Sequence, residues 1–214
     1  MPDPNAPDPT LVRGWLAARS LARGLPMPVM DSGGWRVDTE GESERRRYVF
    51  ADAGPGLQPL LAAITEPRIF VKLCADAATF SALLPPGWAI TDANGMMVTD
   101  RMAPAQPLPP GYTVATHTTG SVTHVAIAAP DGSEAASGYA AECDGIFVYD
   151  RIVTAEAHRR RGLGRVLMAT LGAARRDETS RQILTATIMG AALYTALGWR
   201  LYCPYTTAVR LDPA

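Results

Sequence analysis

The stretch IVTAEAHRRRGLGRVLMATL, residues 152–171, decides the fold of the C-terminal half of the chain. It starts with β-branched residues that favour a strand, passes through a basic turn with two glycines, and continues as an apolar repeat at helical spacing. A helix that begins after such a turn presents unpaired N–H groups and the positive end of its dipole, which together bind phosphate oxygens. Gly162 and Gly164 allow the backbone to approach those oxygens closely, and the neighbouring arginines add charge-assisted hydrogen bonds. The stretch therefore predicts a diphosphate site.

Three other interpretations of the same turn have to be weighed. A Walker A loop needs Lys and then Ser or Thr after its last glycine, but Gly164 is followed by Arg165 and Val166. A dinucleotide fingerprint needs a third glycine where this chain has Leu167. Three consecutive arginines are also typical of a solvated helix start. Taken alone, the turn leaves a ligand site and a charged surface both open.

Strands dominate the residues before this turn, and helices alternate with strands after it. The Asp-Gly pair at 131–132 predicts a hairpin turn. Expected strands cover 112–118, 122–128, 135–141, 146–154, 183–187 and 199–209, and expected helices cover 159–175 and 191–197. This order predicts an α/β (α+β) fold with a mixed central sheet and flanking helices.

The front of the chain predicts a second α/β region. Residues 1–10 alternate proline with acidic or small residues and predict a disordered tail, and residues 103–111 contain four prolines and predict a linker. Between them, residues 11–102 form the N-terminal α/β region, and residues 112–214 form the C-terminal domain. The front region is expected to hold a helix that begins at Thr10, strands at 35–39, 47–51 and 69–73, and helices at 55–64 and 76–84.

Two motifs in the C-terminal half resemble the GNAT acetyltransferases. RRRGLG at 159–164 matches the family signature R/Q-x-x-G-x-G/A, between a fourth strand and a long helix. Further on, a strand at 183–187 and a helix that ends in YTALGW at 194–199 look like the family's Y-x-x-L-G-F/W. The resemblance covers about residues 112–210 and implies the GNAT fold for them. The order strand, helix, strand, helix in the front region suggests the hypothesis of a degenerate second copy, and because this region lacks the signature, no cofactor site is expected in it.

The resemblance implies acetyl-coenzyme A as cosubstrate and assigns residues to it. Tyr194 would protonate the departing thiolate, and Asp150 or Glu142 is a tentative base for the amine. The expected cofactor-binding residues are Ile152, Val153, Thr154, Arg159, Arg160, Arg161, Gly162, Leu163, Gly164, Arg165, Thr187 and Tyr194.

The function implied is transfer of an acetyl group to a primary amine by direct attack in a ternary complex. The alternative is a non-catalytic acyl-coenzyme A sensor, and Tyr194 favours the enzyme. The chain departs from the family at one important place. Only a few residues separate the strands expected at 112–118 and 122–128, where two helices normally cover the acceptor site. Something else must cover that face, and the front region supplies helices that can do so.

Composition, charge and cysteine spacing limit which partners, metals and cellular location are expected. The chain has 214 residues, of which 47% are hydrophobic, and a formal net charge of −1, so no overall basic field attracts nucleic acid or an anionic membrane. The three cysteines are widely spaced and no histidine lies near them at metal-ligand spacing, so no metal is expected. The first thirty residues lack the apolar run of a signal peptide, so a cytoplasmic location is expected. By the same resemblance, a homodimer paired through the last strands is expected.

Overall fold

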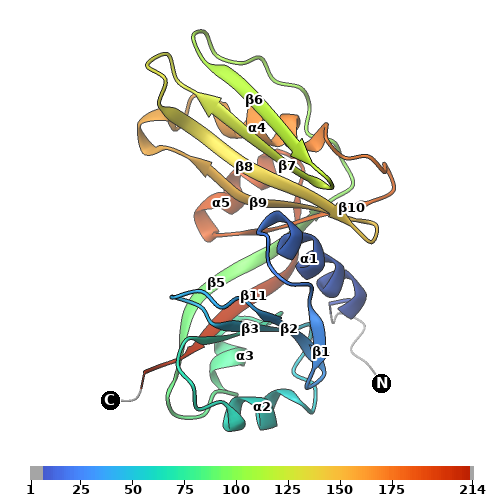
Figure 1. The fold of residues 1–214 in the computed structure, drawn as a ribbon, viewed down its shortest axis with the longest axis vertical. Helices are drawn as coiled ribbons and strands as arrows, with labels where there is room; N and C mark the ends of the chain where they lie inside the picture. The colour runs from blue at the N-terminus through green and yellow to red at the C-terminus, as the bar shows by residue number, and fades with distance from the viewer. Residues whose placement is uncertain (1–6, 213–214) are drawn as a thin grey trace.

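The computed structural model describes residues 7–212 and places all of its strands in one mixed sheet (Figure 1). The strand order is β1-β2-β3-β4-β11-β5-β10-β9-β8-β7-β6. The strands are β1 (Val29–Asp31), β2 (Gly34–Asp38), β3 (Arg46–Phe50), β4 (Ile69–Leu73), β5 (Trp88–Thr99), β6 (Thr113–Thr119), β7 (Val122–Ala128), β8 (Glu134–Cys143), β9 (Ile146–Thr154), β10 (Arg181–Ala186) and β11 (Arg200–Arg210). The helices are α1 (Pro9–Ala22), α2 (Leu57–Ala63), α3 (Ala77–Ser81), α4 (Leu163–Gly172) and α5 (Ile188–Ala196), with a 3-10 turn η1 at Glu156–His158. The predicted mixed sheet with flanking helices is confirmed.

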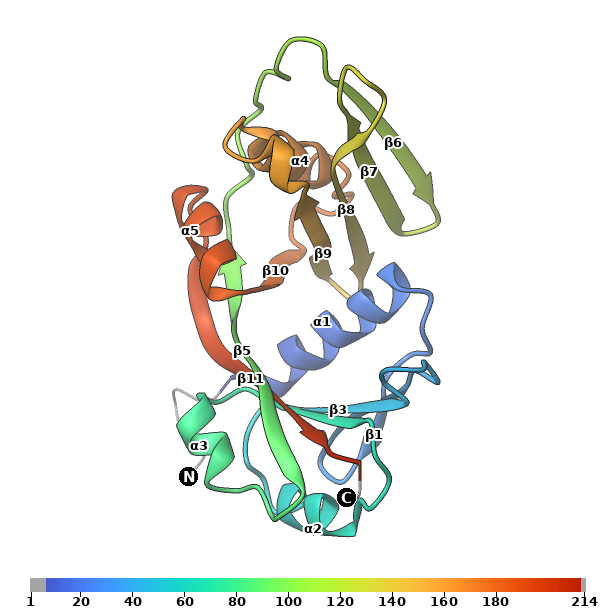
Figure 2. The ribbon, with the colours of Figure 1, turned by 90° about the vertical axis from the view of Figure 1, so that its left-hand side faces the viewer.

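The two ends of the sheet repeat one order of elements. β3, α2 and β4 form a parallel strand–helix–strand unit, as do β9, α4 and β10. Each unit is followed by a short helix and a long strand. The long strands are exchanged between the two ends, because β5 lies beside β10 and β11 lies beside β4. They pair with each other along the middle and join the two parts of the molecule (Figure 2).

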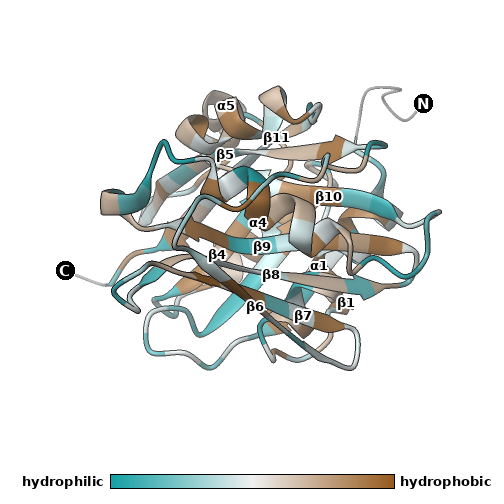
Figure 3. Ribbon diagram, turned by 90° about the horizontal axis from the view of Figure 1, so that it is seen from above, coloured by the Kyte–Doolittle hydropathy of each residue, from teal (hydrophilic) through white to brown (hydrophobic). Residues whose placement is uncertain are grey.

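Helices cover both faces of the C-terminal part of the sheet. Helices α4 and α5 pack on one face, around a core that includes Phe147, Leu167 and Tyr194. Seen from above, hydrophobic residues run along both of these helices (Figure 3). Helix α1 packs on the opposite face, where Leu16 and Trp15 meet Val148 of β9 and Tyr205 of β11. The front region thus covers the face that the short gap between β6 and β7 leaves open, as the sequence predicts.

Helix α1 starts earlier than expected. The side chain of Asp8, not Thr10, caps it by accepting a hydrogen bond from the backbone N–H of Thr10 at 2.9 Å, and Pro9 occupies the first turn, where a missing N–H costs nothing. The predicted tail at 1–10 therefore ends in ordered structure at its last residues, and residues 1–6 lie outside the described part of the chain.

One strand was missed by the sequence prediction and one helix start was misplaced, each for a physical reason. Strand β5 was not predicted, because Asp92, Asn94 and Gly95 are poor strand formers; long-range pairing with β10 and β11 holds it extended. Helix α4 begins at Leu163 instead of Arg159. Arg160 and Gly162 have φ values of +62° and +83°, which a right-handed helix cannot include.

The last strand has no free edge. Strand β11 pairs with β4 on one side and β5 on the other, and β1 and β6 are the outer strands of the sheet. A homodimer stays a prediction, but the expected route through the last strands is blocked. Among residues 7–212, no helix has both the length and the apolar character needed to cross a membrane.

Candidate functional site

The parallel strands β9 and β10 separate along their length. They pair only from Ile146 to Tyr149 of β9 and from Arg181 to Leu184 of β10, although β9 continues to Thr154 and β10 to Ala186. In the front half, β3 and β4 pair over the whole of both strands. Of these two parallel pairs, only the C-terminal one therefore opens a gap, along which β9 has no strand paired with it on that side.

A bulge in β9 marks the start of this gap. The pairing of β8 with β9 shifts between Ser137 and Tyr139, and Arg151 adopts φ +53°, a left-handed value that is uncommon for a residue with a side chain. Gly138 faces the bulge. A Cβ added at Gly138 would lie 2.5 Å from Cδ1 of Ile152, so the bend of β9 depends on a glycine opposite it.

The basic turn follows the gap directly. It runs from Arg159 into α4, and its three consecutive arginines are exposed. Within residues 7–212, no protein acceptor pairs with the backbone N–H groups of residues 160–164, whereas the N–H groups of Arg165 and Val166 donate to the Gly162 carbonyl. A Cβ at Gly162 would meet nothing within 4 Å. The turn thus offers five unpaired N–H groups and open space beside positive charge, which suits an oxyanion.

A cavity of about 240 Å³ lies where β9 and β10 separate. Asp150 to Ile152 and Thr185 to Thr187 contribute its strand walls, and Tyr194 of α5 lines it from the α4 and α5 face. Tyr194 is buried, its ring packs edge-on against Trp199, and burial raises the pKa of its phenol to about 12. The hydroxyl therefore stays protonated near neutral pH and can donate a hydrogen bond into the cavity.

Asp150 lies in this cavity but is poorly suited to act as a base. Its carboxylate accepts two hydrogen bonds from Arg23, at 2.6 and 2.9 Å, and lies within 3.5 Å of guanidinium nitrogens of Arg19 and Arg151. Although desolvation opposes the effect, these arginines keep the pKa of Asp150 below its ordinary value. A carboxylate held ionised by three cations binds a proton weakly, so the geometry argues against the base role predicted for Asp150.

The other residues predicted for the site fall into two groups. Glu142 does not line the cavity. Its carboxylate accepts hydrogen bonds from the backbone N–H groups of Arg176 and Asp177 and stabilises the turn after α4. This position argues against the base role predicted for Glu142. Thr187 does line the cavity, and its hydroxyl caps α5 by accepting from the N–H of Gly190 at 3.1 Å. Its hydroxyl hydrogen remains available to a ligand.

Sequence reasoning missed Arg19 of α1 and Arg23, the residue at the C-cap of that helix. Both line the cavity from the face opposite Tyr194. Each lies more than 120 positions from Asp150 in the sequence, and α1 shows only an ordinary amphipathic pattern. The available signal was indirect: the missing cover over the acceptor face required a helix from the front region.

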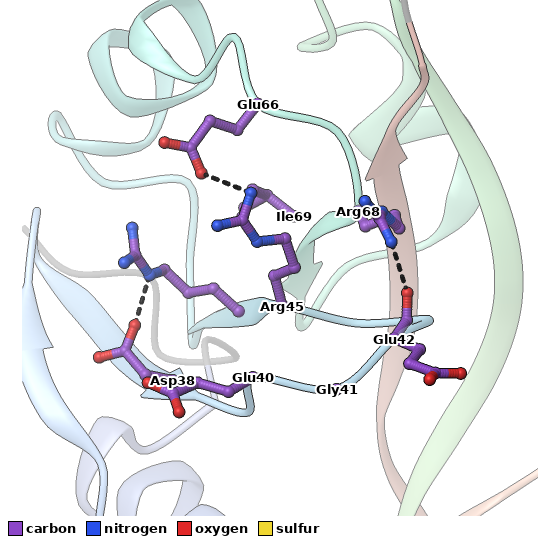
Figure 4. A pocket seen from close by; sticks show the side chains of 9 residues that line it. Asp38, Glu40, Gly41, Glu42, Arg45, Glu66, Arg68 and Ile69 are labelled. Carbon is purple, nitrogen blue, oxygen red and sulfur yellow. Dashed lines mark hydrogen bonds and ion pairs between the residues drawn. The ribbon is translucent and has the colours of Figure 1, made fainter.

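A larger hollow of about 600 Å³ lies at the opposite end of the molecule, at the turn between β2 and β3 (Figure 4). Its charged side chains pair among themselves. Arg45 lies 3.5 Å from Glu66, Arg46 pairs with Asp38, and Arg68 donates to the Glu42 carbonyl at 2.8 Å. None of the predicted site residues lines it, so the smaller cavity is the candidate site.

Comparisons with known proteins agree on one family. Residues 115–201 match the family model described as the acetyltransferase (GNAT) domain, and no curated protein sequence matches the chain. A GCN5-related N-acetyltransferase from Kribbella flavida has a similar structure, with a TM-score of 0.64 at 16% identity over 95% of this chain and 96% of that one. An acetyltransferase titled as putative and of the GNAT family, from Novosphingobium aromaticivorans, has a TM-score of 0.60 at 18% identity, covering 96% and 100%. A tandem GNAT protein from the clavulanic acid biosynthesis pathway has a TM-score of 0.57 at 14% identity, covering 85% and 79%.

Proposed function

We propose that this acyltransferase, whose residues 115–201 match the GNAT acetyltransferase domain, moves an acetyl group from acetyl-coenzyme A to a primary amine by direct attack in a ternary complex. One observation carries the proposal. The gap between β9 and β10 ends at a turn with five unpaired N–H groups, so a single extended ligand with a diphosphate at one end fits both. Acetyl-coenzyme A has that form and supplies an acetyl group activated as a thioester.

The turn at residues 159–165 would hold the diphosphate. The N–H groups of Arg160 to Gly164 point to this role, because they lack acceptors within the described chain and lie at the positive end of α4. The exposed arginine side chains supply further charge-assisted hydrogen bonds. Arg159 already donates to the Thr154 carbonyl at 3.3 Å, so its first contribution is to hold the turn against the end of β9.

The gap would hold the pantetheine arm. Backbone groups from Ile152 to Thr154 continue β9 beyond its pairing with β10, and an amide-containing chain can replace the missing strand there. The Thr187 hydroxyl lies on the other wall and can donate one hydrogen bond. This mode uses backbone groups for most contacts, so the side chains at these positions are free to vary.

The residues of the cavity would position the reactants and stabilise the leaving group. An amine entering from the α1 face meets the thioester in the small cavity, which replaces a bimolecular encounter with a positioned one. As the C–S bond breaks, Tyr194 would donate its hydroxyl hydrogen toward the sulfur. Neither Asp150 nor Glu142 is placed to take the amine proton. We therefore propose that the amine binds neutral and loses one proton to water after it attacks, and that the Tyr194 phenolate takes a proton back from water.

The proposal is tested by calorimetric titration of acetyl-coenzyme A. Gly162 has φ +83°, so its replacement would also strain the backbone, and a charge-only variant is more informative. In the double variant Arg161→Glu, Arg165→Glu, two positive charges beside the proposed diphosphate become negative. We expect micromolar affinity for the native chain and a loss of at least about 100-fold in the variant, because charge-assisted contacts to phosphate are among the strongest polar contacts.

The control is Arg200→Glu, at an exposed residue that starts β11 and lines neither the cavity nor the turn. It changes net charge in the same direction and should leave the affinity within about threefold. A native chain that is folded but shows no heat of binding, or a double variant that binds like the native chain, contradicts the proposal.

A further inference from the structure

We propose that the amine acceptor carries a carboxylate, and that Arg19 binds this carboxylate with Arg23 beside it; the inference rests on the proposed function. The acceptor would then be a small amino acid or a similar amino carboxylate. The residues that line the cavity on the α1 face carry the argument.

Arg19 has unused hydrogen-bond donors in a buried position. Its Nε and Nη1 atoms are inaccessible to solvent and have no hydrogen-bond partner among residues 7–212, although Nε lies 3.4 Å from an oxygen of Asp150. Its ion pair with Asp150 includes no hydrogen bond, and a planar carboxylate matches the geometry of a guanidinium better. Burial and the positive charges of Arg47 and Arg23 lower the pKa of Arg19 to about 10, so it remains charged at neutral pH. Arg19 is therefore a buried cation whose charge Asp150 compensates only in part.

The carboxylate beside Arg19 is already engaged by another arginine. Asp150 is the one carboxylate among the residues that line the cavity, and its two oxygens already accept from Arg23. Arg151 is held elsewhere, with its guanidinium stacked on the Tyr139 ring and donating to the Ala22 carbonyl. Three arginines against one carboxylate leave the cavity with a surplus of positive charge.

Size and charge together restrict the acceptor. A cavity of about 240 Å³ is smaller than the sites that hold drug-sized ligands. The surplus positive charge disfavours polyamines and aminoglycosides, whose several ammonium groups would be repelled. A small amine whose own carboxylate pairs with Arg19 fits both the volume and the surplus of positive charge in the cavity.

The test compares two product-like probes that differ only in charge, N-acetylglycine and N-acetylglycinamide, with coenzyme A present. Binding is followed by NMR titration of the probes against the native chain. We expect N-acetylglycine to bind at least tenfold more tightly than the amide. In Arg19→Gln the ratio should fall to within about twofold, and Arg23→Gln should reduce it in part.

Arg13→Gln is the matched control, because Arg13 lies on the same helix and pairs at the surface with Asp144, 3.1 Å away. It should keep the native ratio. The inference is overturned if the native chain does not prefer the carboxylate, or if folded Arg19→Gln keeps the preference. Should Arg19→Gln fail to fold, the native ratio and the more exposed Arg23 decide the matter.

A parallel titration with acetyl-coenzyme A separates the two proposals. Tight binding of acetyl-coenzyme A without a preference for the carboxylate probe would contradict the proposed carboxylate-bearing acceptor but would still support the proposed function. A folded native chain that does not bind acetyl-coenzyme A removes the proposed function itself.

Discussion

At the scale of single residues, burial decides what the ionisable groups near the cavity can do. Tyr194 and Asp150 line the same cavity, yet burial keeps the phenol protonated while three arginines keep the carboxylate ionised. The site therefore holds a hydrogen-bond donor and an ionised carboxylate, and neither of these two groups has a pKa close to neutrality. A mechanism built on positioning suits these residues better than one built on a strong base.

Replacing Tyr194 with Phe should lower kcat about 100-fold, the usual range for loss of a general acid, and leave the affinity for acetyl-coenzyme A within about threefold. Steady-state release of free thiol measures kcat, and calorimetry measures the affinity for acetyl-coenzyme A. Tyr202→Phe is the control, since the Tyr202 hydroxyl bonds to the backbone of Asp8 on the surface. An unchanged kcat in Tyr194→Phe would leave Tyr194 with a packing role only.

Lys72 gives a prediction on stability that is independent of function. Burial lowers its pKa to about 8, against 10.5 for an ordinary lysine; its ammonium group donates to the Thr207 hydroxyl at 3.2 Å and lies over the Phe70 ring. The unfolded chain therefore binds more protons between pH 8 and 10.5, and the stability contributed by this position rises with pH over that range.

The variant Lys72→Met removes this dependence. Relative to the variant, the native chain should gain up to roughly 3 kcal/mol of unfolding free energy between pH 8 and pH 10.5, since each unit of pKa shift corresponds to about 1.4 kcal/mol. Denaturant titrations of both chains at several pH values measure the difference in their unfolding free energies. Because both chains contain the same tyrosines, the titration of those tyrosines cancels in the difference. A difference that does not change with pH would show that Lys72 titrates normally.

At the scale of elements, the bulge of β9 controls the gap. Gly138→Val should push Ile152 toward the gap, weaken acetyl-coenzyme A binding by about tenfold and cost about 1–3 kcal/mol of stability, as overpacking generally does. Calorimetry and denaturant unfolding check the two effects. Ser137→Val introduces the same side chain on the neighbouring, half-buried residue of β8 and should spare the affinity. Equal losses in both variants would mean that the strand tolerates no added bulk anywhere.

Local patterns predicted most of the elements that surround the site. The strand Ile69–Leu73 was predicted to the residue, and the strand, basic turn and helix at 146–172 were predicted in order. The start of α4 was misplaced because positive φ at Arg160 is a property of the folded turn, not of arginine. The ion pairs of Asp150 with α1 were missed because nothing in a local pattern reports which distant helix will cover a strand.

At the scale of the whole molecule, the two parts of the sheet depend on each other. The boundary predicted at residues 103–111 falls in a segment without helix or strand between β5 and β6, and the division into an N-terminal region and a C-terminal domain remains a prediction. The exchange of β5 and β11 could not be read from the sequence, because a local pattern does not report which distant strand will lie beside a given strand. It places the last strand of each half in the sheet of the other.

We therefore expect residues 103–214 alone to fail to fold. This piece would lose β5, which separates β10 from β11, and the cover of α1 over Val148 and Ile183. Exposing that apolar face should give a chain with little NMR dispersion and no binding of acetyl-coenzyme A. A mixture with residues 1–102 should recover both properties if the two pieces associate. A well-dispersed spectrum of the shorter piece alone would contradict the interdependence of the halves.

The central claim is that one ligand occupies both the gap in β9 and the turn before α4, and hydrogen exchange measures this most directly. Amide exchange of the native chain should slow on addition of acetyl-coenzyme A at residues 152–154, where β9 continues beyond its pairing with β10, and at residues 160–164, whose N–H groups lack acceptors within residues 7–212. Residues 46–50 and 69–73, the fully paired strands of the front half, should be unaffected. Binding without protection at 160–164, or with protection confined to the front half, would contradict the account.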